Sequence, residues 1–164
     1  MFTRIQSRAF VVLSLGLVPI AHSLNSQSVT RADKPSQDNK IELSYHVKAI
    51  KRDSAGQYTM SGTVNGELQG RATLVFGFDE GSSGQAGKAL VHSYWVVKAE
   101  PASESFKAKL SGTAEVVSGQ THLVGKITEG ANKGHRVETS SRLLNFGPNG
   151  SLSDIDGNMI IDGK

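Results

Sequence analysis

An alternation of apolar and polar side chains, repeating every two residues, runs through this chain from Ile41 almost to its end. Successive side chains of a β-strand point to opposite faces, so a period of two indicates strands with one buried face. The clearest stretches are residues 41–49, 68–78 and 106–116. A helical spacing would place the charged residues of these stretches within the apolar stripe. The sequence therefore predicts an all-β domain.

Turn-forming residues separate the alternating stretches. Asn65-Gly66 is the strongest signal, because a two-residue hairpin turn needs positive φ at both positions, which asparagine and glycine tolerate. Clusters of Gly, Pro, Asn, Asp and Ser mark the other connections. We expect eight strands, at residues 41–51, 57–64, 67–78, 88–99, 104–117, 120–129, 135–146 and 151–161. The last of them contains Asp156-Gly157-Asn158, which is a turn signal of its own.

Eight consecutive strands with short connections predict an antiparallel up-and-down β-barrel, because closure pairs the two edges of the sheet. A two-sheet β-sandwich could use the same strands and is the alternative, but its longer crossing connections are mostly missing. Small residues on the expected inward faces permit strong coiling and should leave room for side chains or one small ligand. These residues are Gly62, Gly70, Ala72, Ala108, Gly112, Ala114 and Gly125.

The expected outward faces are too charged for a barrel set in a lipid bilayer. Lys107 and Lys109 would face lipid, where a lysine at the midplane costs roughly 2–4 kcal/mol. The longest apolar stretch in the chain, residues 9–21, is also shorter than the roughly 20 residues that a spanning helix needs. We therefore expect no membrane span.

Residues 1–23 have the three parts of a secretory signal peptide. Arg4 and Arg8 supply positive charge, residues 9–21 are apolar, and Ala21-His22-Ser23 places small residues at the two positions that a signal peptidase reads. We expect cleavage near Ser23 and a secreted or periplasmic protein. Residues 24–40 are polar and aperiodic, which predicts a disordered lead-in. Residues 41–164 then form a single β-barrel domain.

The composition of the chain excludes some classes of partner and of catalytic chemistry. The chain has 18 basic and 15 acidic side chains, a net charge of +3. Cleavage near Ser23 would remove Arg4 and Arg8 and no acid, which leaves a net charge of +1 and no reason to expect a nucleic-acid partner. The chain has no cysteine, which excludes disulfides, thiolate nucleophiles and cysteine-ligated metal sites.

The chain carries no motif typical of a hydrolase elbow, a phosphate loop, a zinc protease or a dinucleotide fold. Its histidines at 46, 92, 122 and 135 lack the local pairing that would indicate a metal site. Residues 154–158 have oxygen ligands at alternate positions, but a calcium loop needs glycine at its sixth position, where this chain has Met159, and glutamate at its twelfth, which the sequence does not reach. We expect no catalytic residue, no metal and no cofactor.

The expected strand 88–99 is largely apolar on both faces. One face includes Ser93 and Trp95 and should point to the core, and the other carries Leu90, His92, Tyr94 and Val96 between two lysines. Such a strand is either covered by another element or is a contact surface. Residues 24–40 or the 79–87 loop are the candidate covers, and the loop could also act as a lid. With Tyr45 and Tyr58, the four outward residues form the candidate ligand or partner surface.

These observations favour an exported β-barrel that acts as a binding or interaction module for a small apolar molecule or a protein. An isomerase or cyclase working in the barrel pocket is the enzyme alternative, with Tyr45, Tyr58, His92 and Tyr94 as its polar groups. A surface or matrix protein that self-associates through Leu90, Tyr94 and Val96 is the third hypothesis. The sequence leaves the identity of the ligand and the oligomeric state open.

Overall fold

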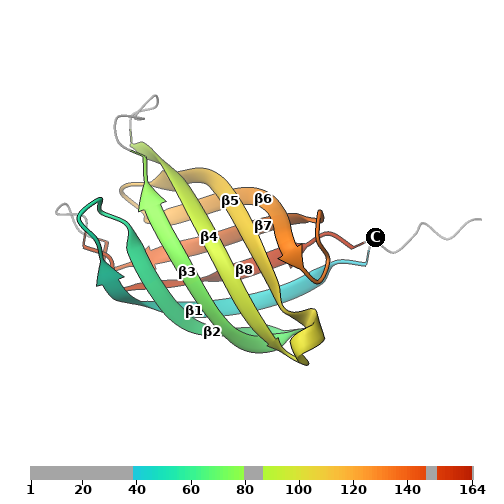
Figure 1. Cartoon of the computed structure of the whole chain (residues 1–164). Coiled ribbons are helices and arrows are strands. Elements are labelled where there is room, and N and C mark those ends of the chain that lie inside the picture. The colour runs from blue at the N-terminus through green and yellow to red at the C-terminus, as the bar shows by residue number, and fades with distance from the viewer. Residues whose placement is uncertain (1–38, 80–86, 147–150, 164) are drawn as a thin grey trace, which may run out of the picture. The chain divides into compact units, whose positions relative to one another are not determined.

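The computed structural model describes residues 39–79, 87–146 and 151–163 as a closed antiparallel barrel. Each strand pairs with the next, and β8 pairs with β1 to close the sheet (Figure 1). The predicted eight-stranded up-and-down β-barrel is confirmed, and a two-sheet sandwich is not the fold. The predicted signal peptide and almost all of the lead-in lie outside the described residues. The strands are β1 (Ile41–Arg52), β2 (Tyr58–Gly66), β3 (Gln69–Phe78), β4 (Lys88–Glu100), β5 (Phe106–Glu115), β6 (Gln120–Gly130), β7 (Arg136–Leu144) and β8 (Asp154–Ile161), with a 3-10 helix η1 (Ala102–Glu104) before β5.

The hairpin turn predicted at Asn65-Gly66 is wrong by two residues. Strand β2 continues through Gly66, which lies opposite Leu43 of β1, and the chain reverses between Gly66 and Gln69. Gly66 has a φ of +131°, and a Cβ there would lie 2.5 Å from the carbonyl oxygen of Glu42. The glycine is therefore needed for a close approach of β1 to β2 rather than for the turn.

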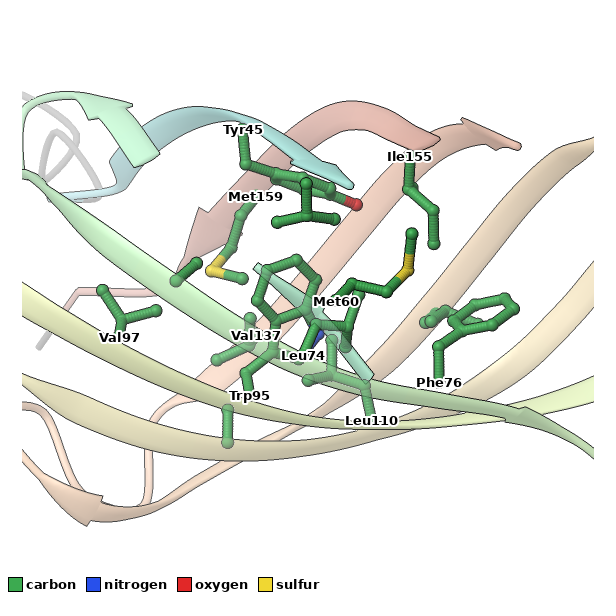
Figure 2. Close-up of a cluster of buried hydrophobic side chains, with 14 of the residues drawn as sticks. Tyr45, Met60, Leu74, Phe76, Trp95, Val97, Leu110, Val137, Ile155 and Met159 are labelled. Carbon is green, nitrogen blue, oxygen red and sulfur yellow. The ribbon is translucent and has the colours of Figure 1, made fainter. Parts of the chain in front are cut away.

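The interior of the barrel is filled by side chains from all eight strands. Trp95, Phe76, Phe106 and Met60 are among the largest fully buried residues, and Figure 2 shows Trp95 and Met60 beside Tyr45 and other core side chains. The rings of Trp95 and Tyr45 meet edge to face with centroids 4.8 Å apart. The indole N–H of Trp95 donates to Ser93 Oγ at 3.2 Å. The inward orientation predicted for this face of β4 is confirmed.

The small inward residues do not leave the room that the sequence suggested. A Cβ on Gly62 would lie 1.8 Å from the carbonyl oxygen of His46, and one on Gly125 would lie 1.9 Å from that of Lys109. Gly70 and Gly112 face neighbouring strand backbone in the same way. The strongly coiled sheet thus places backbone where these side chains would be, so the glycines allow close strand approach instead of opening a cavity.

Candidate functional site

The six residues predicted from the sequence lie on both sides of the barrel wall. Leu90, His92, Tyr94 and Val96 share the outward face of β4; Leu90 is 43% exposed and the other three are half-buried. Tyr45 and Tyr58 point inward and are buried. The structure therefore brings four of these residues onto one surface and separates them from the two tyrosines by the sheet itself.

His92 is held in place over a glycine of the neighbouring strand. Its Nδ1 lies 2.8 Å from a carboxylate oxygen of Asp79, and its Nε2 lies 3.4 Å from the side-chain nitrogen of Gln57. The ring covers Gly77, where a Cβ would come within 2.6 Å of Nε2. Asp79, the first residue of the predicted covering loop, thus contacts His92, while residues 80–86 of that loop lie outside the described part of the chain. His92 acts here as a cover for the backbone of β3.

Tyr45 belongs to a buried group of hydroxyls inside the barrel. Burial raises the pKa of Tyr45 to about 12, while hydrogen bonding with the nearby hydroxyl of Ser141 opposes that shift. Ser141 Oγ is also hydrogen-bonded to Thr121 Oγ1. The phenol is therefore neutral at physiological pH and serves as a hydrogen-bonding group rather than as a base.

Tyr58 is buried near the β1–β2 turn. The guanidinium of Arg52 lies 5.3 Å from the centroid of its ring, within the range of a cation–π contact. Tyr58 therefore does not contribute to the outward surface of β4, because its ring packs in the core and contacts Arg52.

A row of polar side chains that the sequence did not single out crosses the outer wall. Its members lie directly opposite one another on five neighbouring strands, and four of them are exposed. They border a shallow groove of about 1000 Å³, which we call the polar groove. In strand order from β5 through β8 to β1 the row is Thr113, His122, Ser140, Asn158 and Ser44.

Charged and amide side chains border the polar groove on the side of the β5–β6 turn. Glu115, Gln120, Arg142 and Asp156 lie there, each exposed. The side chains of Gln120, Arg142 and Asn158 form no hydrogen bond or ion pair with other described residues. Their donors and acceptors are therefore available to a ligand, and water satisfies them in its absence.

Two histidines near the polar groove are fixed by neighbouring acids. His46 Nδ1 contacts a carboxylate oxygen of Asp156, and its Nε2 lies 3.6 Å from Asp154. His122 Nε2 lies 3.7 Å from Glu138, and its Nδ1 lies 3.5 Å from the hydroxyl of Ser140. These contacts orient the imidazoles, so His122 presents a fixed edge to the groove.

Tyr45 connects the predicted residues with the polar groove. It borders the groove from beneath, where its ring passes Gly157 of β8 on the inner side. A Cβ on Gly157 would lie 2.8 Å from Cζ of Tyr45 and 2.5 Å from Cβ of Ser141. Gly157 therefore keeps β8 continuous across the predicted turn signal while giving the tyrosine ring space.

Neither metal ligation nor helical membrane insertion is indicated within residues 39–79, 87–146 and 151–163. No group of three or more His, Asp or Glu side chains in these ranges could hold a metal ion. These ranges also hold no helix with the length and apolar character that crossing a membrane requires. No protein-family model matches the chain, and no curated protein is significantly similar to it in sequence.

Proposed function

We propose that this protein is a binding module that holds a polyhydroxylated ligand, such as a segment of an oligosaccharide, in the polar groove on the outer wall of the barrel. The observation that carries the proposal is the unbroken row of hydrogen-bonding side chains over five adjacent strands. Sugar hydroxyls both donate and accept hydrogen bonds, and so do the serine, threonine, asparagine and histidine side chains of the row. Strands lie 4.7–4.9 Å apart, so the row extends over roughly 19 Å of the sheet.

The filled interior supports placing the ligand outside. Trp95, Phe76 and Met60 occupy the space that a small apolar ligand would need, and the inward glycines face backbone. Close-packed cores accept little extra volume without strain. A small apolar ligand within the barrel, which the sequence favoured, has no support from this packing.

The arrangement of the four predicted polar groups gives the enzyme alternative no common pocket. Tyr45 and Tyr58 point into the core, whereas His92 and Tyr94 lie on the outer face of β4. Groups that act together on one substrate must come within hydrogen-bonding reach of the reacting atoms. Self-association through β4 relies mainly on Leu90, because Tyr94 and Val96 are half-buried within their own wall.

Export belongs to the same proposal. The charged, apolar and small-residue segments of residues 1–23 support secretion or a periplasmic location, where polysaccharides are accessible ligands. Detection of the chain in the secreted or periplasmic fraction, with a new N-terminus near residue 24, is the expected result. A chain that stays in the cytoplasm with residues 1–23 intact would contradict it.

Titration of the isotopically labelled protein with neutral hexasaccharides of glucose, xylose and N-acetylglucosamine tests the binding site. We expect amide shifts concentrated in β6, β7, β8 and β1 with at least one sugar. Asn158→Ala should weaken that binding at least fivefold, while the matched control Thr73→Ala, exposed on the outer face of β3, should leave it unchanged. Shifts confined to inward residues or to β4, or the lack of binding to every sugar in the series, would overturn the proposal.

A further inference from the structure

A row of cations crosses the outer wall of the barrel on three neighbouring strands. Lys109 of β5 lies directly opposite Lys126 of β6, which in turn lies directly opposite Arg136 of β7. All three side chains are exposed. Tyr94 of β4 lies opposite Lys109 at the end of the row. We call these four residues the cationic row.

The pairing of Lys109 with Lys126 is unfavourable by itself. Like charges directly opposite one another on adjacent strands destabilise a sheet. Neither lysine forms an ion pair with another described residue. Arg136 is different, because Glu138 lies 2.8 Å and Asp162 lies 3.6 Å from its guanidinium.

The same two strands show a favourable pairing next to the unfavourable one. Lys107 of β5 lies opposite Glu129 of β6, and the two charges are 2.6 Å apart. An acid thus lies opposite Lys107, whereas a second lysine lies opposite Lys109, which is two residues further along β5. An external anion would neutralise the exposed pair of Lys109 and Lys126.

We propose that the cationic row is a second binding site, which takes a linear anionic polysaccharide carrying carboxylate or sulfate groups. Adjacent cations lie about one strand spacing apart, roughly 5 Å, so successive acidic groups of a chain can each meet one. The ring of Tyr94 provides an apolar surface for a sugar at the end of the row. This proposal does not depend on the polar groove, whose row lies four residues away along β6.

The shape of the charged surface favours a chain over a membrane. Glu129, paired with Lys107, lies on one side of the cationic row and Glu138 lies on the other, so the positive charge outside the Lys107–Glu129 pair forms a strip one residue wide. A flat anionic bilayer would bring these carboxylates against lipid headgroups of the same charge. A flexible chain can follow the strip and avoid them.

Two other anionic partners fit the surface less well. Single-stranded nucleic acids rely on several aromatic side chains for base stacking, whereas the row holds one, the half-buried Tyr94. Acidic peptide motifs are recognised mainly by clusters of arginines, whereas the row holds one arginine, Arg136, whose guanidinium already contacts Glu138 and Asp162. The polysaccharide is therefore the occupant that the geometry supports.

The decisive variant is Lys109→Glu, which replaces the repulsive pair with a complementary one. We expect hexagalacturonate or a sulfated hexasaccharide to bind the wild type, with affinity falling as salt rises, and to bind Lys109→Glu at least tenfold more weakly. The thermal midpoint of Lys109→Glu should equal or exceed that of the wild type. Lys51→Glu, an exposed lysine on β1 outside the row, makes the same change in net charge and should bind normally.

Several outcomes would overturn the proposal. If Lys51→Glu lost as much binding as Lys109→Glu, the loss would be explained by the change in net charge alone. A lower thermal midpoint for Lys109→Glu than for the wild type would show that the lysine pair is not repulsive. Tighter binding of phosphatidylglycerol vesicles or of single-stranded DNA than of the anionic hexasaccharides would assign the row to a different partner. Asn158→Ala should leave anionic binding intact, so failure of the polar-groove proposal and failure of this one are distinguishable.

Discussion

The inner and outer faces of strands β6, β7 and β8 carry similar small polar residues in different environments. Ser141 points inward to the buried hydroxyls of Tyr45 and Thr121, while its neighbour Ser140 points outward into the polar groove. Gly157 and Asn158 alternate in the same way, with Gly157 against the ring of Tyr45 and Asn158 on the outer side, and all four residues border the polar groove. The difference teaches that one residue type can stabilise the barrel or serve a ligand, depending on whether its position in the strand is odd or even. Inner substitutions should therefore change stability, and outer ones should change binding.

Truncation of the largest inner side chain should have the largest effect. Trp95→Ala removes a residue that is 1% exposed, together with its edge-to-face contact with Tyr45. We expect a loss of about 3–5 kcal/mol in the free energy of unfolding, measured by urea denaturation. A loss below about 1 kcal/mol would show that the interior is not tightly packed.

Adding one methyl group should distinguish an inner from an outer glycine. Gly125→Ala places a Cβ 1.9 Å from backbone and should destabilise the barrel by about 1–3 kcal/mol. Gly77→Ala meets the imidazole of His92 instead, which can swing away, so its cost should be smaller. Paired thermal melts check this order, and an equal or larger effect at Gly77 would contradict it.

Alkaline pH should reveal the buried tyrosine. The pKa of Tyr45 is raised to about 12 in the folded state from 10.0, so its contribution to stability is present below about pH 10 and is lost as pH rises through about 12. The free energy of unfolding should fall more steeply over this range in the wild type than in Tyr45→Phe. The difference amounts to about 3 kcal/mol at most. Identical slopes in the wild type and in Tyr45→Phe would refute the role of burial.

Substitutions of the adjacent residues Ser140 and Ser141 should give the smallest changes in stability, but they should differ clearly in their effect on sugar binding. Ser141→Ala removes a half-buried hydrogen-bonding partner of Tyr45 and Thr121 and should cost about 1 kcal/mol. Ser140→Ala should change stability by less than about 0.5 kcal/mol, because the side chain is exposed. Sugar binding should weaken in Ser140→Ala and persist in Ser141→Ala. The reverse pattern would place the ligand inside the barrel.

The alternation in the sequence was sufficient to predict the strands, their inward faces and their order in the barrel. It did not locate the β2–β3 turn, because the extent of β1 beside Gly66 depends on pairing between strands. The expectation that Gly62 and Gly125 leave room inside the barrel was also wrong, because the backbone of the neighbouring strand occupies the space beside each glycine. The polar groove and the cationic row could not be predicted from the sequence for a related reason. Lys109, Lys126 and Arg136 are far apart in the chain, and register alone aligns them.

Closure of β8 on β1 has a consequence for how the chain reaches its folded state. Residues 41–48 pair with residues 154–161, so the contacts that complete the sheet join segments at opposite ends of the domain. Such distant pairing slows folding, because a long loop must close before the contact is gained. Until β8 is available, β1 and β7 each present an open edge to other chains. We therefore expect a chain halted before residue 154 during synthesis to aggregate rather than form a smaller barrel.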